Sequence, residues 1–278
     1  MNILYYTRVN IFCSLHDNVD VTKLIKSIKI LSKTNKILKI EEFDATYNNK
    51  NNKEDCNIYF FIKNNTFNVS FSHLYYDGYS IGFIAEKIDQ IYKDEIENYK
   101  FDFYDDNYSK LNLIKNTIKI IPRYNYKNLY YAFFKKQNKK TIKILKTTLN
   151  ELSTKEIVHY LVDRLKIENY CLTLNARKKY TEYEGVLGNL VHYSGILNKN
   201  TNIKHTSHSN KNDSVEKVIN SSCPQTLQIN SYLNFKLPSF LKYFFPPQNV
   251  HIFSGNYILI HPVNNNEKYI IVDYYYFT

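Results

Sequence analysis

The chain has 278 residues, of which 44% are hydrophobic, and this length and composition predict a globular protein with a sizeable core rather than a disordered chain. Its 37 Lys and Arg outnumber its 26 Asp and Glu, and the net charge of +11 favours an anionic partner: nucleic acid, a membrane surface or a phosphorylated small molecule. No apolar run approaches the roughly 20 residues that cross a bilayer, so we expect no membrane-spanning helix.

The four cysteines lie far apart, and no secretory signal is recognised at residues 1–5, so we expect reduced thiols and a cytoplasmic location. An even number of cysteines also allows two disulfides, which the missing signal disfavours. Heavy use of Lys, Asn, Ile and Tyr is typical of AT-rich coding, so the positive charge does not choose among the anionic partners.

The first half of the chain predicts the order β-α-β-β-β-α. A strand is expected at residues 2–14, a helix after Asp20 as its N-cap, a further strand at 40–47 and a polar loop at 48–55. Two alternating runs, 57–63 and 66–73, flank Asn64-Asn65 and predict a hairpin, because asparagine tolerates left-handed backbone. Apolar residues at helical spacing then predict a helix at 80–92.

The end of this hairpin carries the first candidate for chemistry. Phe67, Val69 and Phe71 alternate with polar residues, as in a half-buried strand, and His73 continues the apolar parity. His73 is therefore expected to face inward, at the mouth of a turn that contains Asp77 four residues later. An imidazole in this position could serve as a general base whose orientation the carboxylate helps to fix.

The second half also mixes strands and helices. After a linker at residues 100–109 and a helix or strand at 110–121, a strand is expected at 139–149 and a helix after Ser153, with Glu156 at the capping-box spacing. Further strands are expected at 170–175, 188–193, 228–235, 250–253, 257–262 and 269–277, with a polar loop and a short helix at 198–218. The chain therefore predicts two domains, 1–105 and 106–278, of a mixed α/β class.

Three short motifs resemble one known family. His73-Leu74-Tyr75-Tyr76-Asp77-Gly78 resembles the HxxxDG signature of the coenzyme A-dependent acyltransferase superfamily, which includes chloramphenicol acetyltransferase, the plant BAHD enzymes and peptide-synthetase condensation domains. Asn175-Ala176-Arg177-Lys178-Lys179, with the later Gly188-Asn189, is similar to its N-x-R-x-R segment and trailing Gly-Asn. Asn230-Ser231-Tyr232 resembles its Ser-aromatic pair, and all three motifs occur in family order.

The sequence departs from the family at several points. Ser72 stands where condensation domains have a second histidine, Lys179 replaces the second arginine of N-x-R-x-R, and the plant DFGWG motif is absent. Only 72 residues precede His73, so the first lobe would be a short one. The chain is thus not a plant-type member.

The resemblance implies two chloramphenicol-acetyltransferase-like lobes, each a mixed-sheet two-layer sandwich, with a tunnel between them. It implies transfer of an acyl group, expected to be acetyl, from a coenzyme A thioester to a hydroxyl or amine of a small acceptor such as a sugar or metabolite, without an acyl-enzyme. Acyl-coenzyme A would be a co-substrate, with no permanently bound cofactor or metal, no membrane or nucleic-acid partner, and a monomeric protein.

The resemblance also implies a role for each site residue. His73 would be the general base, Ser231 would stabilise the oxyanion, and Asp77 would pair with Arg177 to fix the turn. Gly78, Asn189 and Tyr232 would bind substrate or cofactor, and Lys178 and Lys179 could meet coenzyme A phosphates.

Each of these roles has a simpler alternative explanation. His73 could be a satisfied core histidine, Arg177 a surface cation, Ser231 an ordinary strand serine, and Gly78 the residue that supplies a positive φ. His205 and His208 do not complete a metal site, His251 and His261 are expected to be structural, and Cys13 inert. The whole chain could be a degenerate relative that binds without catalysis, or a nucleic-acid binder whose 27 tyrosines stack on bases.

Overall fold

The computed structural model describes residues 8–40, 57–72, 75–104, 137–178, 181–194, 196–198, 227–233, 235–244, 256–262 and 268–277. The chain divides into two compact units, each described by itself below. Unit 1 is Met1–Leu113 with Gly185–Asn189 and Lys236–Val250, and unit 2 is Ile114–Glu184 with Leu190–Phe235 and His251–Thr278. The expected domain boundary between residues 105 and 106 lies outside the described residues and stays a prediction.

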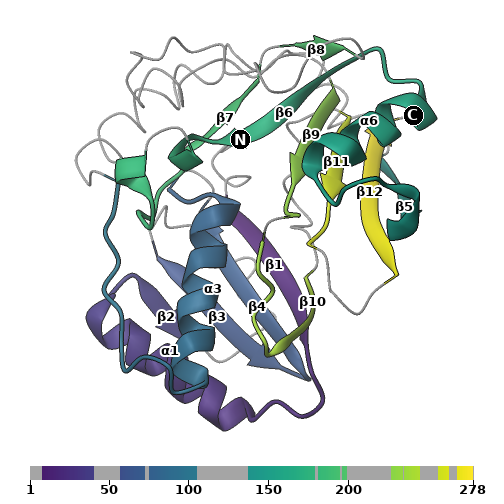
Figure 1. Cartoon of the computed structure of the whole chain (residues 1–278). Helices are drawn as coiled ribbons and strands as arrows, with labels where there is room; N and C mark the ends of the chain where they lie inside the picture. Colours follow the sequence, from purple (N-terminus) through teal and green to yellow (C-terminus); the bar gives the residue numbers. More distant parts are fainter. Residues whose placement is uncertain are drawn as a thin grey trace. The chain divides into compact units, whose positions relative to one another are not determined.

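Unit 1 is a five-stranded mixed sheet in the order β10-β1-β4-β3-β2. The strands are β1 (Arg8–Leu15), β2 (Leu38–Ile40), β3 (Ile58–Lys63), β4 (Thr66–Ser72) and β10 (Leu241–Phe244), and the helices are α1 (Val21–Thr34) and α3 (Gly78–Tyr92). β2 and β3 are parallel, and the other pairs are antiparallel. Figure 1 shows α3 crossing the sheet, and α1 packs beside it.

Local sequence explains most of unit 1. Asn64 and Asn65 join β3 to β4 with φ of 49° and 58°, which confirms the predicted left-handed hairpin turn. Asp20 caps α1, where its Oδ1 accepts a hydrogen bond from Lys23 N–H at 2.9 Å, also as predicted. Leu24, Ile28 and other apolar side chains of α1 and α3 pack on the inward residues of the strands in one core.

One expectation for unit 1 needs correction. β4 is not half-buried: its polar residues Asn68, Ser70 and Ser72 are 6%, 5% and 5% exposed, so both faces of the strand are covered. Of the strand expected at residues 40–47, Ile40 is described, at the end of β2 (Leu38–Ile40), and residues 41–47 lie outside the described part. The alternation of apolar and polar residues predicts which face of a strand turns toward the core, but it does not predict what covers the other face.

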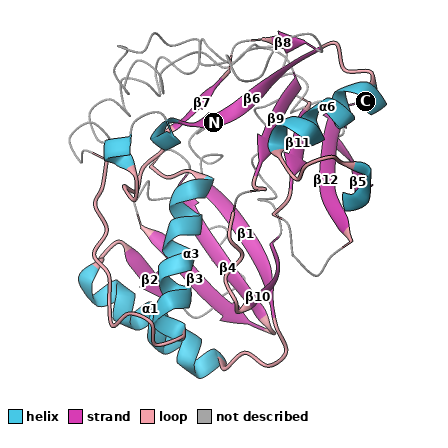
Figure 2. Cartoon of the chain, viewed as in Figure 1, coloured by secondary structure: helices cyan, strands magenta, loops and turns pink. Residues whose placement is uncertain are grey.

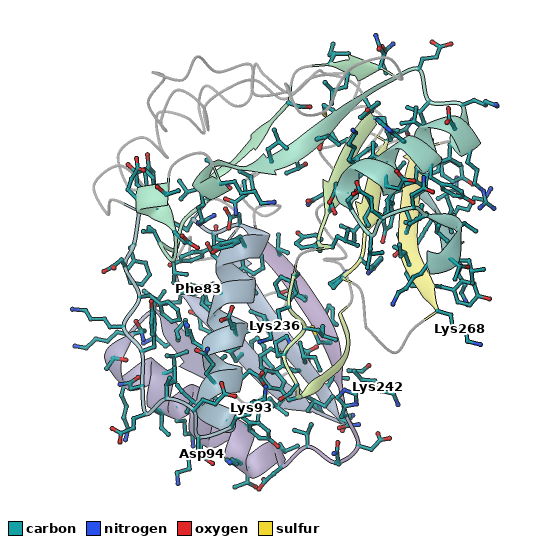
Figure 3. The ribbon with its side chains drawn as sticks, in the orientation of Figure 1. Phe83, Lys93, Asp94, Lys236, Lys242 and Lys268 are labelled. Atoms are coloured by element: carbon teal, nitrogen blue, oxygen red, sulfur yellow. The ribbon has the colours of Figure 1, made fainter. Side chains whose placement is uncertain are left out.

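β10 returns to unit 1 from late in the chain, which the sequence did not predict. It pairs antiparallel with β1, and the Phe240 ring just before it lies edge-on to Phe67 at 5.4 Å and to Tyr92 at 6.2 Å between centroids. Asp89 of α3 accepts a hydrogen bond from Ser239 N–H at 3.0 Å and pairs with Lys93 at 2.7 Å. Figure 3 labels Lys93 and also Lys242 of β10. Residues 236–244 thus complete the first core.

Unit 2 is a mixed sheet in the order β5-β12-β11-β9-β6-β7, with β8 paired to β6. Its strands are β5 (Gln137–Leu145), β6 (Asn169–Asn175), β7 (Val191–Tyr193), β8 (Leu197–Asn198), β9 (Leu227–Ser231), β11 (Tyr257–Ile260) and β12 (Tyr269–Phe277). The helix α6 (Thr154–Leu165) packs its buried residues Ile157, Val158, Leu161 and Val162 on the apolar face of this sheet. Its N-cap Ser153 accepts from Glu156 N–H at 3.2 Å, as predicted.

Some strands of unit 2 differ from expectation in length. β5 ends at Leu145, and Lys146–Thr148 form a 3-10 turn instead of continuing the strand. The strand expected at 188–193 is reduced to β7 (Val191–Tyr193), because residues up to Asn189 belong to unit 1. Asn198, the first residue of the loop and helix expected at 198–218, ends β8 instead, and the rest of that segment and the strand expected at 250–253 lie outside the described residues.

Both units are mixed sheets that carry helices, so the predicted two-layer α/β class is confirmed (Figure 2). The expected tunnel between the lobes stays a prediction. Within the described part of the chain, every helix is too short or too polar to cross a membrane.

Candidate active site

The structure describes six of the seven predicted site residues. Asp77, Gly78 and Asn189 belong to unit 1, whereas Arg177, Ser231 and Tyr232 belong to unit 2. His73 lies outside the described residues, directly after the end of β4 at Ser72. In the sequence, the predicted base falls between β4 and α3.

Asp77 is the N-cap of α3. Its side chain is fully buried, its backbone is extended with φ −106° and ψ 175°, and its Oδ1 accepts a hydrogen bond from Ser80 N–H at 2.8 Å. A carboxylate at a helix N-terminus is stabilised by the otherwise unpaired N–H groups and by the helix dipole. Gly78 begins the helix, and the alternative that it supplies a positive φ is wrong, since Gly185 is the glycine with positive φ among the described residues.

Ser80 links this turn to a segment 108 residues away in the sequence. Its fully buried hydroxyl oxygen lies 3.0 Å from Asp77 Oδ1 and 2.9 Å from the carbonyl oxygen of Gly188, and it accepts from Gly188 N–H at 3.0 Å. Asp77 N–H also donates to the Gly188 carbonyl at 3.3 Å. Sequence reasoning missed Ser80, whose one local signal is its place in the first turn after the capping aspartate.

The segment Gly185–Asn189 is fixed within unit 1 along its length. Gly185 has φ +80°, and a Cβ there would lie 3.5 Å from the ring of Phe83, labelled in Figure 3. Leu187 N–H donates to the carbonyl of Asp102 at 2.8 Å, and Tyr104 N–H donates to the carbonyl of Leu187 at 2.8 Å. The structure therefore brings Gly188-Asn189 beside the turn that carries Asp77.

Arg177 is buried rather than a surface cation, so that alternative is wrong. It is 4% exposed in the 3-10 turn Ala176–Lys178 that follows β6. Asn175 Oδ1 accepts from both the backbone N–H and the guanidinium of Arg177, at 3.0 and 3.2 Å. This contact explains the asparagine two residues before the arginine. Lys178 beside it is exposed, and Lys179 lies outside the described residues.

Ser231 and Tyr232 lie on opposite faces at the end of β9. The hydroxyl of Ser231 is 2.9 Å from that of Thr154, the first residue of α6, and accepts from Leu233 N–H at 3.3 Å. Tyr232 packs on the other side, against Tyr257, Leu259 and Tyr275.

Asp273 is the centre of a second polar cluster, in unit 2. Its carboxylate is 2% exposed and accepts hydrogen bonds from Thr141 Oγ1 at 2.7 Å, Lys139 Nζ at 2.8 Å and His261 Nε2 at 2.9 Å. Burial raises its pKa, but the hydrogen bonds from His261, Lys139 and Thr141 outweigh burial and hold the pKa well below that of an ordinary aspartate. His261 therefore forms a hydrogen bond with a buried carboxylate.

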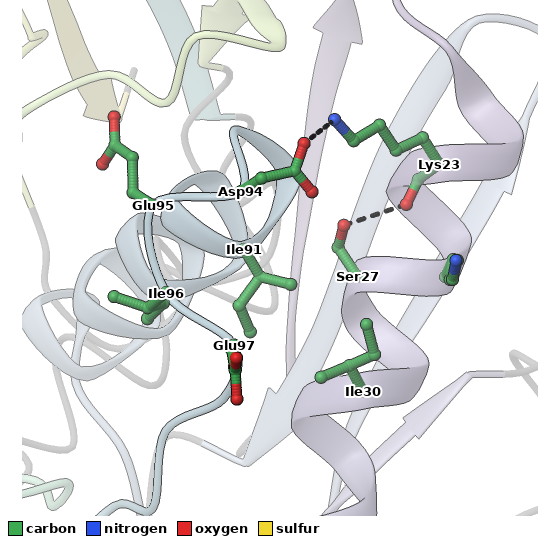
Figure 4. Close-up of a pocket in the computed structure, with 9 residues that line it drawn as sticks. Lys23, Ser27, Ile30, Ile91, Asp94, Glu95, Ile96 and Glu97 are labelled. Atoms are coloured by element: carbon green, nitrogen blue, oxygen red, sulfur yellow. Dashed lines mark hydrogen bonds and ion pairs between the residues drawn. The ribbon is translucent and has the colours of Figure 1, made fainter.

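A surface hollow of unit 1 lies at the other end of α3 from Asp77. Figure 4 shows it between α1 and the turn after α3, with Lys23 reaching Asp94 at 2.6 Å. Its lining residues are Lys23, Lys26, Ser27, Ile30, Ile91, Asp94, Glu95, Ile96 and Glu97. It shares no residue with the predicted site. Within the described ranges, no three His, Cys, Asp or Glu side chains group as metal ligands would, and His205, His208 and His251 lie outside those ranges.

The fold of the chain is similar to that of solved condensation domains and of TRI101. The starter condensation domain of rhizomide synthetase RzmA, a mutant in complex with C8-CoA, is similar with a TM-score of 0.59 and 8% identity, over 98% of this chain and 84% of that chain. TRI101 of F. sporotrichioides, complexed with coenzyme A and T-2, is similar with a TM-score of 0.55 and 9% identity, over 99% and 92%.

The first condensation domain of the CDA synthetase is also similar, with a TM-score of 0.52 and 9% identity, over 98% of this chain and 85% of that chain. No family model and no curated protein sequence matches the chain. The likeness is therefore one of fold, and it confirms the fold that the three motifs predict.

Ser80→Ala should lower the free energy of unfolding by about 1–3 kcal/mol, because it leaves the buried Gly188 N–H without its acceptor. Urea denaturation measures this loss. The matched control is Ser32→Ala, since Ser32 donates to the carbonyl of Lys29 in its own helix, and its effect should stay within about 0.5 kcal/mol. Equal effects of the two substitutions would contradict the role given to Ser80.

Asp273→Asn should lower the free energy of unfolding by about 1.5–3 kcal/mol at pH 7, because it removes a charged acceptor of several hydrogen bonds. The folded pKa is lowered, so this stability is present in full above the unfolded pKa of about 3.9 and declines as the pH falls toward the folded pKa. The gap between wild type and variant should therefore shrink below pH ~4. The control is Asp94→Asn in the exposed Lys23–Asp94 pair, which should lower the free energy of unfolding by less than about 1 kcal/mol. A difference between wild type and Asp273→Asn that does not change with pH would refute the prediction.

Proposed function

We propose that the protein is an acyltransferase that moves an acyl group from a coenzyme A thioester to a hydroxyl or amine of a small acceptor. The observation that carries this proposal is the turn after β4, where buried Asp77 caps α3 and Ser80 joins the turn to Gly188. The Asp77-Gly78 end of the HxxxDG motif thus lies close to Gly188 of the Gly-Asn motif, in a fold similar to that of solved proteins in complex with C8-CoA and with coenzyme A.

In this proposal His73 is the general base. An imidazole titrates near neutral pH, so it can take the proton of an acceptor hydroxyl or amine as the nucleophile attacks the thioester carbonyl. The new C–O or C–N bond forms, the C–S bond breaks, and the proton passes from His73 to the departing coenzyme A thiolate. No acyl-enzyme is needed. The acyl group is proposed to be acetyl and the acceptor a sugar or metabolite, with acyl-coenzyme A as co-substrate and a monomeric protein.

Arg177 and Ser231 complete the proposed site from unit 2. A buried guanidinium requires anionic or multiple neutral acceptors, and the buried carboxylate of Asp77 is the partner that the motif implies. The Ser231 hydroxyl would donate to the oxyanion of the tetrahedral intermediate, a contribution of the kind that such donors make in acyl transfer. Gly78, Asn189 and Tyr232 are proposed to contact the substrates.

His73→Ala should lower the rate of coenzyme A release from acetyl-coenzyme A by roughly 10²–10⁴-fold in the presence of an acceptor panel, because it removes the general base. A thiol reagent measures the released coenzyme A. The control His16→Ala changes a histidine in the loop after β1 and should leave the rate unchanged. If wild type and His73→Ala are equally inactive with every donor and acceptor, a binding protein without catalysis replaces this proposal.

A double-mutant cycle tests the proposed pair of Asp77 and Arg177. Asp77→Asn keeps a side chain that can cap α3, and Arg177→Met removes the guanidinium, so the coupling between them reports the ion pair. We expect a coupling of about 1–3 kcal/mol in urea denaturation. Arg164, which donates to Tyr160 OH on the surface of α6, is the control and should not couple to Asp77. A coupling energy below about 0.3 kcal/mol would show that Asp77 and Arg177 do not pair.

A further inference from the structure

The sheet of unit 2 has an aromatic and charged face on the side opposite α6. Ile258, Ile260 and Val272 belong to the core under α6, so the alternating residues of β11 and β12 point the other way. Tyr257, Leu259 and Tyr275 form a buried cluster on that opposite face, and Tyr257 pairs directly with Tyr275 across the two strands. Asp273 lies on the same face, directly opposite Leu259.

His261 lies at the edge of this face, beside a predicted site residue. It follows the last residue of β11, Ile260, which is aligned with Ser231 in the parallel strand β9. Tyr232 N–H donates to the carbonyl of Ile260 at 2.9 Å, and the Tyr232 ring packs against the aromatic cluster. His261 and Tyr232 are therefore neighbours at the same end of adjacent strands.

Asp273 fixes which nitrogen of His261 can accept a hydrogen bond. The ionised carboxylate is an acceptor, so the His261 nitrogen 2.9 Å away, Nε2, must carry the proton. Nδ1 of a neutral ring is then the acceptor. The His261 side chain is 11% exposed to solvent.

We propose that His261 binds the acyl acceptor, with Nδ1 accepting a hydrogen bond from the hydroxyl or amine of that molecule and Tyr232 contacting its apolar body. This inference rests on the proposed acyl transfer. It selects the class of ligand, because a ring nitrogen held as an acceptor requires a donor, and the neighbouring tyrosines favour an aromatic or apolar body. Asp273 is then a positioning residue, which acts through the imidazole.

The first test is spectroscopic. Long-range ¹H–¹⁵N spectra of the full chain labelled in histidine nitrogen should show His261 with its proton on Nε2. Addition of 2-phenylethanol or tyramine should shift the His261 Nδ1 resonance, whereas ethylbenzene, which has the same aromatic body without a donor, should not. A proton on Nδ1, or no shift with either donor probe, would overturn the proposal.

The second test uses variants in the same titration. His261→Phe should weaken binding of the donor probes about tenfold, the size of one lost hydrogen bond, without changing that of ethylbenzene. Asp273→Asn should weaken it as well, because an amide no longer holds the ring in one tautomer. Thr141→Val is the matched control: it removes another hydrogen bond to Asp273 and should leave probe binding unchanged. Equal losses in Thr141→Val and Asp273→Asn would reduce His261 to a structural role.

Kinetics separate this inference from the proposed function. If wild type releases coenzyme A, His261→Phe should raise the KM for the acceptor about tenfold and leave the KM for acetyl-coenzyme A unchanged. An unchanged acceptor KM overturns the role of His261 while acyl transfer stands. If wild type releases no coenzyme A but the Nδ1 shift is observed, acyl transfer fails and the binding site stands.

Discussion

The buried carboxylate of Asp77 is the constraint on which unit 1 depends, because a buried charge must be satisfied by donors. It obtains them from the N–H of Ser80 and from a serine hydroxyl that is shared with Gly188. Capping α3 and holding the Gly185–Asn189 segment are thus one hydrogen-bonded arrangement. A change in either partner should therefore disturb the start of α3 at its N-cap Asp77, four residues after the predicted base in the sequence.

Completing unit 1 requires parts of the chain that are distant in sequence. Gly188 reaches the N-terminus of α3, and Phe240 fills the core beside Phe67 while β10 pairs with β1. Both contacts close long loops, so their entropic cost is met only once the first sheet and its helices have formed. The order of stability should therefore follow local structure first, with the returning segments added to a formed sheet. The proposed site depends on the second of these steps.

Elements with a local cause could be predicted from the sequence, and elements with a distant cause could not. The Asn64-Asn65 turn, the caps Asp20 and Ser153, and β12 follow from neighbouring residues, and the structure confirms them. β10 was missed because its four residues show no period of their own and gain their pairing from β1. The same limit applies at the site: Ser80 has no motif, and the partner of His261 lies on another strand, 12 residues away.

Asp77 and Asp273, both buried, show how the same side chain can have different effects. Asp77 directs its hydrogen-bonded oxygen at a serine and at backbone N–H, so it fixes the course of the chain. Asp273 accepts from an imidazole, so it fixes a ring and the nitrogen that the ring presents. A base that removes a proton needs a well-placed backbone, whereas a group that recognises a donor needs a defined tautomer. Placing these two requirements on separate carboxylates lets recognition change through the neighbours of His261 while the turn after β4 stays the same.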